Sequence, residues 1–167
     1  MQFEDYLAIQ NIINSYPRYA DKGDFDAVGR VLGETVSGAG TGKNGEKIGF
    51  NAEGAEAWTK LYTQTVRKYP DRGTPKTRHL IGNIVIEPDG PDKANAESYV
   101  VVFQQTDTLP LQPIVAGTYF DKFAKIDGKW KLVERWEDME LHGDLSQHMI
   151  PCDITSEFIN SLSKKPA

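Results

Sequence analysis

The stretch that decides the fold runs from residue 117 to residue 136 and consists of GTYFDKFAKIDGKWKLVERW. Apolar and aromatic residues recur largely at every second position on both sides of Asp127-Gly128, and a period of two is typical of β-strands. An Asp-Gly pair between two such runs favours a tight turn. The sequence therefore predicts a hairpin of two long antiparallel strands, residues 114–127 and 129–142.

Two further strands precede this hairpin, at about 77–87 and 93–107, and short connections rich in proline and glycine separate the strands. Both alternating faces of the four strands are largely apolar, whereas a sheet with one wet face alternates more cleanly. We therefore expect helices on one face of the sheet and another subunit of the same chain on the other. This arrangement predicts a homodimer or a homotrimer.

The N-terminal part of the chain predicts three helices. Residues 3–20 place apolar side chains three and four positions apart, although Pro17 is expected to kink or interrupt this helix. Asp24 is a typical N-cap of a second, short helix that ends near Gly33. A third helix is predicted from about residue 52 to residue 68.

Between the second and third helices, the glycine-rich segment 37–50 predicts a hairpin with an Asn-Gly turn at 44–45. Helices followed by a meander of antiparallel strands make an α+β roll, in which a strongly bent sheet wraps around the helices. A bent sheet that is closed by helices leaves a conical cavity where chemistry can take place. We expect a single domain, residues 1–148, and a C-terminal tail, residues 149–167.

Composition argues against several classes of partner. The 167-residue chain has a formal net charge of −5 and scattered basic residues, which disfavours nucleic acid or an anionic membrane surface. It has no apolar run near the roughly 18 residues that span a bilayer, and no N-terminal export signal is recognised. Its single cysteine, Cys152, excludes an internal disulfide, and a cytoplasmic location is expected.

Two residues stand where chemistry could occur, but neither is decisive by itself. His79 begins the 77–87 strand, and a single histidine on an apolar strand face is most often structural. Asp21 lies at the end of the first helix, where a carboxylate is usually solvated and where Lys22 could pair with it.

Three segments of the sequence, taken together, resemble one family: YADKGDFDAVGRVL at 19–32, TRHLIGNIVIE at 77–87 and GTYFDKFAKIDGKWKLVERWEDMELHGDLSQH at 117–148. The chain resembles the scytalone dehydratase-like and SnoaL-like branch of the nuclear transport factor 2-like (NTF2-like) superfamily over about residues 3–148. The resemblance implies a cone-shaped α+β barrel, with three N-terminal helices packed in a strongly curved antiparallel sheet.

The resemblance also implies a set of catalytic residues. In scytalone dehydratase-like and hexachlorocyclohexane dehydrochlorinase-like enzymes, an aspartate at the end of the first helix orients a histidine, and this histidine abstracts a proton. Asp21 and His79 stand at these two positions. Arg135 matches an arginine that lines the cavity in the dehydrochlorinase-like relatives, where it would stabilise a developing anion. An internal ion pair between Arg135 and Asp121 is an equally open alternative.

Further candidates would contact the substrate: Tyr16, Tyr19, Tyr119, Asn83 and Trp58. Tyr119 matches a strand position that lines the pocket of scytalone dehydratase, and Asn83 shares the predicted strand face with His79. For each tyrosine, packing in the core with one hydrogen bond is an alternative role. Trp58 belongs to an apolar helix stripe for which a place in the core is favoured.

The sequence departs from the scytalone dehydratase pattern at one position. The second histidine of that enzyme falls here at Ser98 or Tyr99, which favours a different substrate. No metal is expected, because His142 and His148 lie six residues apart with no clustered carboxylates beside them. No nucleotide cofactor is expected either, because no glycine-rich phosphate loop opens a helix after a strand.

The favoured function is therefore a cofactor-independent lyase or isomerase with a small apolar, aromatic or cyclic substrate. His79 would remove a proton, and the substrate would lose water, halide, formaldehyde or nothing. The alternative is a non-catalytic module of the same fold, such as a ligand-binding adaptor or the structural small subunit of a ring-hydroxylating oxygenase.

Overall fold

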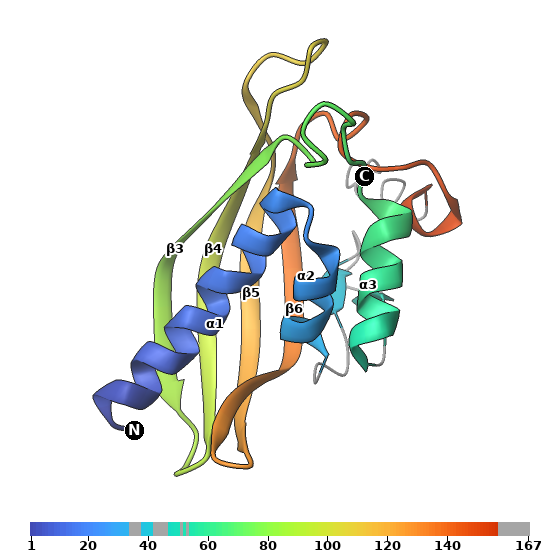
Figure 1. The fold of residues 1–167 in the computed structure, drawn as a ribbon. Helices are drawn as coiled ribbons and strands as arrows, with labels where there is room; N and C mark the ends of the chain where they lie inside the picture. Colours follow the sequence, from blue (N-terminus) through green and yellow to red (C-terminus); the bar gives the residue numbers. More distant parts are fainter. Residues whose placement is uncertain (34–37, 42–46, 51, 53, 157–167) are drawn as a thin grey trace.

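The computed structural model describes residues 1–33, 38–41, 47–50, 52 and 54–156. The helices are α1, Phe3–Lys22, α2, Phe25–Leu32, and α3, Gly54–Thr65. The strands are β1, Gly38–Thr41, β2, Lys47–Phe50, β3, Thr77–Pro88, β4, Lys93–Gln104, β5, Gln112–Ile126, and β6, Lys129–His142. Figure 1 shows the helices lying across one side of the long strands.

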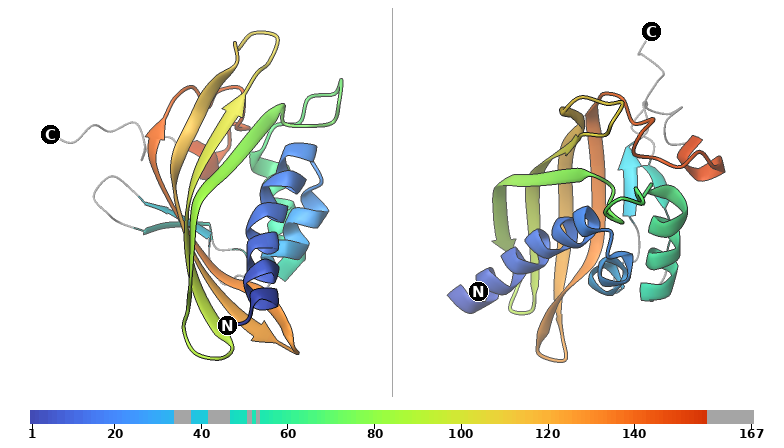
Figure 2. Two further views of the ribbon diagram at one scale, coloured as in Figure 1. Left: turned by 90° about the vertical axis from the view of Figure 1, so that its left-hand side faces the viewer. Right: turned by 45° about the horizontal axis from the view of Figure 1, so that its top comes forward.

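The described strands form one sheet in the order β2-β1-β6-β5-β4-β3. The four long strands pair antiparallel with one another. Seen from two further directions, these strands bend around the helices like the wall of a cone (Figure 2). The predicted α+β roll with a strongly curved antiparallel sheet is therefore confirmed. The sheet ends at β2 and β3 and stays open between them, so it does not close into a complete barrel.

The hairpin of β5 and β6 forms as predicted. Asp127 and Gly128 have φ angles of 50° and 73°, the left-handed conformations that a tight hairpin turn requires. Trp130 Nε1 donates to Asp5 Oδ1 at 2.7 Å, and Lys125 Nζ lies 2.8 Å from the same oxygen. The tip of this hairpin thereby holds the first turn of α1 against the sheet.

Helix α1 continues through Pro17, so the expected interruption does not occur. Pro17 is buried, and the helix runs on to Lys22. Gly23 then ends it with a φ of 70°, and the Gly23 N–H donates to the carbonyl of Ala20 at 2.9 Å. A proline removes one internal hydrogen bond. The last turn of α1 is held by contacts with the sheet, because Asp21 is hydrogen-bonded to β3.

Helix α2 begins at the predicted cap and packs closely on α3. Asp24 Oδ1 accepts a hydrogen bond from the Ala27 N–H at 3.0 Å. Gly29 lies against α3, where an added Cβ would overlap Thr59 Oγ1 and the carbonyl oxygen of Ala55. The absence of a side chain at Gly29 therefore sets how near the two helices come.

Helix α3 ends at Thr65, earlier than predicted. The carbonyl of Thr65 accepts the Ile150 N–H at 2.9 Å, and the Arg67 N–H donates to the carbonyl of His148 at 2.8 Å. Segment 143–150, which follows β6, thus takes the backbone groups that a longer helix would use. Because this contact joins residues far apart in the sequence, local pattern does not predict it. It also packs the first residues after 148 onto the domain.

Segment 37–50 contributes strands to the main sheet. β1 and β2 pair antiparallel, as predicted for a hairpin, and the Asn-Gly turn at 44–45 lies outside the described residues. β1 also pairs in parallel with β6, with Gly38 opposite Arg135. The sheet is therefore wider than the predicted four-stranded meander.

Strand β3 contains a bulge that changes which residues face the helices. Its register with β4 shifts between Gly82 and Val85, and Asn83 has a φ of 52°. His79 is partly buried before the bulge and Ile84 after it, whereas Asn83 is exposed. The prediction that Asn83 shares the inner face with His79 is therefore wrong, because regular alternation does not continue through a bulge.

Adding a methyl group at Gly29 should loosen the contact between α2 and α3. We expect Gly29→Ala to lower the free energy of unfolding by about 1–3 kcal/mol, the usual cost of an overpacked contact. Urea unfolding followed by circular dichroism measures this change. The control is Gly82→Ala, where an added Cβ meets no atom within 4 Å and where we expect a change within about 0.5 kcal/mol. Equal stabilities of the two variants would contradict the prediction.

Candidate active site

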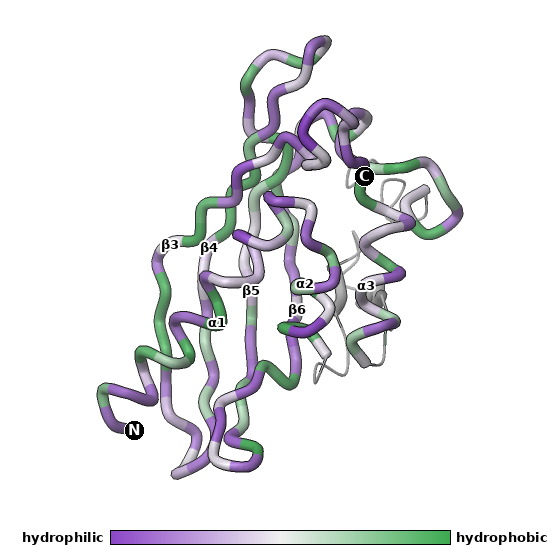
Figure 3. The backbone as a smooth tube through the Cα atoms, viewed as in Figure 1, coloured by the Kyte–Doolittle hydropathy of each residue, from purple (hydrophilic) through white to green (hydrophobic). Residues whose placement is uncertain are grey.

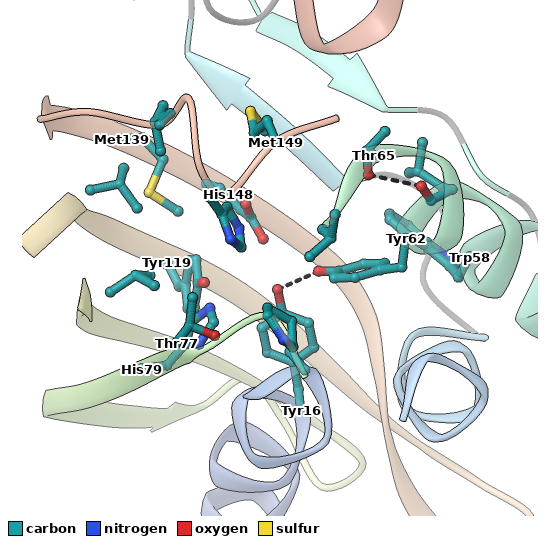
Figure 4. A pocket seen from close by; sticks show the side chains of 18 residues that line it. Tyr16, Trp58, Tyr62, Thr65, Thr77, His79, Tyr119, Met139, His148 and Met149 are labelled. Carbon is teal, nitrogen blue, oxygen red and sulfur yellow. Dashed lines mark hydrogen bonds between the residues drawn. The ribbon is translucent and has the colours of Figure 1, made fainter. Parts of the chain in front are cut away.

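A cavity of about 130 Å³ lies between the helices and the concave face of the sheet. Side chains from α1, α3, the four long strands and segment 143–150 line it (Figure 4). Most of these side chains are apolar. The polar ones are three tyrosines, two histidines, two threonines and one glutamate. An apolar chamber with a few convergent polar groups is typical of a small-molecule site.

Asp21, in the last turn of α1, and His79, near the start of β3, meet in the wall of this cavity. His79 Nδ1 lies 2.6 Å from Asp21 Oδ1, and each side chain is 9% exposed. Asp21 also accepts hydrogen bonds from Thr77 Oγ1 at 2.8 Å and from the His79 backbone N–H at 3.0 Å. The carboxylate thus holds both the imidazole ring and the backbone that carries it.

The protonation state of Asp21 follows from these contacts. Burial alone would raise its pKa, but the hydrogen bonds from His79 and Thr77 outweigh burial and hold the pKa below its usual value. The carboxylate is therefore ionised at neutral pH and accepts the Nδ1–H of His79. Nε2 is then the unprotonated nitrogen of the neutral ring, and it is left to accept a proton from a bound molecule.

Three tyrosines from three elements gather beside His79. The hydroxyls of Tyr16 on α1 and Tyr62 on α3 are hydrogen-bonded to each other (Figure 4). The ring of Tyr16 stands edge-on to those of His79 and Tyr119, with centroids 6.4 Å apart in both pairs. Burial raises the pKa of Tyr16 to about 12 and places those of Tyr62 and Tyr119 well above their usual value. All three hydroxyls therefore keep their protons at neutral pH.

Arg135 lies behind two of these rings. Its Nε and Nη2 each donate to Asp121 at 2.7 Å. Its guanidinium carbon is 4.2 Å from the ring centroid of Tyr119 and 4.7 Å from that of Tyr16. Burial would lower the pKa of Arg135, but Asp121 outweighs burial and raises it. Arg135 is not among the described residues that line the cavity, so the structure shows the internal ion pair rather than direct access to a ligand.

Three titratable residues line the cavity that the sequence did not assign to it: Tyr62 on α3, Glu137 on β6 and His148 in segment 143–150. Burial raises the pKa of Glu137 to about 7 and lowers that of His148 to about 4. Within the described residues, the buried Nδ1 of His148 has no hydrogen-bond partner. Strand alternation could have found Glu137, two positions after Arg135. His148 lies in an irregular segment, for which no pattern predicts the direction of a side chain.

The remaining candidates for substrate contact lie in different places. Trp58 is buried and lines the cavity from α3, and its Nε1 has no hydrogen-bond partner in the part of the chain that the structure describes. Tyr19 is partly buried and Asn83 is exposed. Neither of these two is among the described residues of the cavity wall.

The two histidines considered as metal ligands lie in different surroundings. His142 is exposed at the end of β6, whereas His148 lines the cavity. Among residues 1–33, 38–41, 47–50, 52 and 54–156, no three histidine, cysteine, aspartate or glutamate side chains are grouped as metal ligands. Over the same residues, no helix combines the length and apolar character needed to cross a membrane.

The curved sheet, the three helices and the cavity between them define an NTF2-like fold. The sequence profile of the SnoaL-like domain matches residues 1–136. The chain therefore belongs to the SnoaL-like domain family, which agrees with the resemblance seen in the sequence. Among curated proteins, no sequence matches this chain.

Three solved structures from Novosphingobium aromaticivorans have a similar fold. A proposed scytalone dehydratase is 24% identical, with a TM-score of 0.63 over 84% of this chain and 87% of that chain. An NTF2-like protein with a cystatin-like fold is 23% identical, with a TM-score of 0.64 over 86% of each chain. The beta subunit of a proposed aromatic-ring-hydroxylating dioxygenase is 19% identical, with a TM-score of 0.66 over 87% of this chain and 95% of that chain. At these identities the likeness establishes the fold alone.

The position of Arg135 predicts a large effect on stability. Arg135→Met should lower the free energy of unfolding by about 3–5 kcal/mol, because it leaves the buried Asp121 carboxylate without its partner. The matched control is Lys122→Met, which removes an exposed ion pair with Glu134 on the same two strands and should cost about 0–1 kcal/mol. Urea unfolding measures both changes. An Arg135→Met protein as stable as the wild type would show that the ion pair is dispensable to the fold.

Proposed function

We propose that the protein is a cofactor-independent lyase or isomerase in which His79 abstracts a proton from a small apolar, aromatic or cyclic molecule. The observation that supports this most strongly is the 2.6 Å contact between His79 Nδ1 and Asp21 in the wall of an apolar cavity. A structural histidine could satisfy its Nδ1–H with any acceptor. Here the acceptor is a buried carboxylate, and the ring borders a space that a ligand can fill.

The proposed mechanism assigns one role to each group. Asp21 fixes the tautomer and the orientation of His79, so that Nε2 accepts the proton. The imidazolium that forms is stabilised by the adjacent carboxylate, and burial strengthens this attraction. The hydroxyls of Tyr16 and Tyr119 are hydrogen-bond donors for a substrate oxygen that gains charge. No nucleophile is needed, because the reaction consists of proton transfer and bond cleavage or migration.

A non-catalytic ligand-binding or structural module is the second candidate. The fold of the beta subunit of a proposed aromatic-ring-hydroxylating dioxygenase supports it, because that chain is similar over most of its length. A subunit that only binds or scaffolds has no need for a carboxylate-oriented histidine at its cavity, which is why we favour the enzyme. The two candidates differ in a measurable way: only the enzyme exchanges substrate protons with solvent.

Loss of either member of the pair should abolish proton abstraction. β-Tetralone, a benzo-fused cyclic ketone with acidic α-protons, is the probe, and its α-proton exchange in deuterium oxide is followed by NMR. We expect His79→Ala to slow the exchange by about 10²–10⁴-fold, the usual contribution of a positioned base. Asp21→Asn should slow it nearly as much, and the double variant should be no slower than His79→Ala, because both residues act on one proton transfer. Added chelator should leave the rate unchanged.

The matched control for the aspartate is Asp24→Asn, three positions further along the chain. Asparagine caps a helix about as well as aspartate, so this variant should exchange at the wild-type rate. Thermal unfolding of every variant separates lost chemistry from lost folding. If His79→Ala retains the wild-type rate, or if chelation abolishes exchange, the proposed mechanism is wrong.

We also propose that a second copy of the chain covers the outer face of the sheet. One cross-strand row of this face is apolar on all four long strands: Leu80, Val101, Ala116 and Leu141 are successive partners in the register. Leu80 is 60% exposed and Leu141 is 68% exposed. The hydropathy colouring shows apolar residues over much of β3 (Figure 3). Contiguous apolar surface of this kind is typical of protein interfaces.

Self-association through this face predicts a specific effect of charge. The wild type should be a dimer or trimer in light scattering at micromolar concentration, and Leu80→Glu should shift it toward the monomer, because the charge would be buried in the interface. The control is Leu7→Glu, at a leucine of α1 that is 43% exposed and lies off the sheet. A wild type that is monomeric under these conditions would exclude the proposed interface.

A further inference from the structure

Glu137 occupies a position in the cavity that the proposed mechanism has not used. It lines the cavity from β6 and stands directly opposite Tyr119 in the register of β5 and β6, so both side chains project to the inner face. Opposite Glu137 on its other side, β1 presents Gly40, which has no side chain. Glu137 is partly buried, and its carboxyl group therefore shares the cavity wall with the tyrosines.

Arg135 and His79 each pair with another carboxylate, although Arg135 Nη1 has no hydrogen-bond partner within the described residues. Arg135, two positions earlier on the same strand, gives both Nε and Nη2 to Asp121 at 2.7 Å. His79 is paired with Asp21 at 2.6 Å. Within the described part of the chain, no ion pair joins Glu137 to a cation. A buried carboxyl without a counterion favours its neutral, protonated form.

The titratable groups around the cavity fall into two sets with respect to the protonation of Glu137. Those that act on Glu137 or respond to it come from α1, α3, β5 and β6: Tyr16, Tyr62, Tyr119, Asp121 and Arg135. The others that border the cavity or touch its wall are His79, Asp21 and His148. Burial is the largest influence on the pKa of Glu137 and raises it to about 7, with Arg135 opposing and Asp121 adding to the rise.

The other groups of the cavity are poor proton donors at neutral pH. Burial raises the pKa of Tyr16 to about 12, so its hydroxyl releases a proton only with difficulty. Burial lowers the pKa of His148 to about 4, so this imidazole is neutral and carries no acidic proton to give. An efficient acid has a pKa near the working pH. Among the described residues of the cavity, Glu137 meets this condition.

The two ends of the cavity are far enough apart to hold a ring between them. His79 lies on β3 and Glu137 on β6, with β4 and β5 between them in the sheet. Three strand spacings place the two strands roughly 14 Å apart along the curved sheet, and Glu137 is also offset along β6, because the register puts His79 level with His142. Both side chains reach inward from these positions, which leaves a gap suited to a compact cyclic molecule.

We propose that Glu137 is the general acid that works with His79, and that it protonates the carbonyl oxygen when the substrate is a ketone with an acidic C–H next to the carbonyl. This inference rests on the proposed function of His79. In the step, His79 Nε2 takes the α-proton, and the electron pair of the C–H bond forms the carbon–carbon double bond. The carbonyl π pair moves to oxygen, which receives the proton of Glu137. The products are a neutral enol, a Glu137 carboxylate and a His79 imidazolium, so protons and charge balance.

The enol then determines what the enzyme accomplishes. Return of the proton from His79 to the same carbon gives exchange, and return to another carbon gives an isomer. A ketone that carries a hydroxyl on the β-carbon can instead lose it as water: His79 gives its proton to the departing hydroxyl, and the enol O–H proton returns to Glu137 as the carbonyl re-forms. The acid at Glu137 serves all three outcomes, because each passes through the same enol.

The test is the pH dependence of β-tetralone exchange in the full-length protein. In the wild type the rate should fall as Glu137 loses its proton near pH 7, in line with its raised pKa of about 7. Glutamine keeps the shape of the side chain but cannot give a proton. Glu137→Gln should therefore be about 10²-fold slower and lack the falling limb, whereas Glu137→Asp should retain that limb. The control is Glu134→Gln, on the same strand but in an exposed ion pair, which should match the wild type.

A second measurement needs no substrate. Infrared difference spectra between the wild type and Glu137→Gln should contain a protonated carboxylic acid band that disappears as the pH is raised through 7, the value expected from the pKa of about 7. Absence of this band, or a falling limb that persists in Glu137→Gln, overturns the role of Glu137. A wild type that exchanges no faster than buffer overturns the ketone class. An unchanged rate in His79→Ala overturns the proposed function instead, so the failures are distinguishable.

Discussion

The structure depends above all on how the carboxylates of α1 attach this helix to the sheet. At its C-terminal end, Asp21 accepts hydrogen bonds from the hydroxyl of Thr77, the backbone of His79 and the ring of His79. At its N-terminal end, Asp5 accepts from Trp130 and pairs with Lys125 at the tip of the β5–β6 hairpin. The curved sheet is therefore held to α1 at two points, and the cavity lies near the second of them, beside the last turns of the helix. Asp21 therefore both holds α1 to the sheet and orients the imidazole ring of His79.

A buried ion pair lies outside the described lining of the cavity. Asp121 and Arg135 neutralise each other on adjacent strands, and the guanidinium contacts the rings of Tyr16 and Tyr119. This arrangement places a fixed positive charge behind two phenol rings whose hydroxyls border the cavity. The charge makes the loss of the phenol protons less unfavourable than burial alone would, as the opposing effects on the pKa values of both tyrosines show. Arg135 thus lowers the pKa values of these two tyrosines from a position outside the cavity lining.

The sequence predicted the elements whose signals are local. The β5–β6 hairpin follows from alternation around Asp127-Gly128, and the start of α2 from the capping residue Asp24, because in both cases neighbouring residues supply the cause. Prediction failed where contacts between distant segments determine the end of an element or the direction of a side chain. Segment 143–150 ends α3 by binding its last backbone groups, and a bulge in β3 turns Asn83 outward.

The candidate site shows the same division. Asp21 and His79 could be named from the sequence through the resemblance, and the structure brings their side chains together. For Arg135 the sequence left two arrangements open, and packing selects the ion pair. Glu137 escaped notice because a glutamate in an alternating strand is usually solvated, and only the enclosing α1 and α3 make its surroundings apolar. His148 depends on the path of an irregular segment, which no periodicity describes.

The family profile ends at residue 136, one position before Glu137, and every cavity residue contributed by segment 143–150 also lies beyond that end. His79 and its hydrogen bonds to Asp21 therefore lie within the matched part of the chain, while five of the described residues that line the cavity lie beyond it. The hydrogen bonds that Asp21 and Asp5 make to the long strands all join residues before position 136. The attachment of α1 and the far wall of the cavity are thus carried by separate stretches of the sequence.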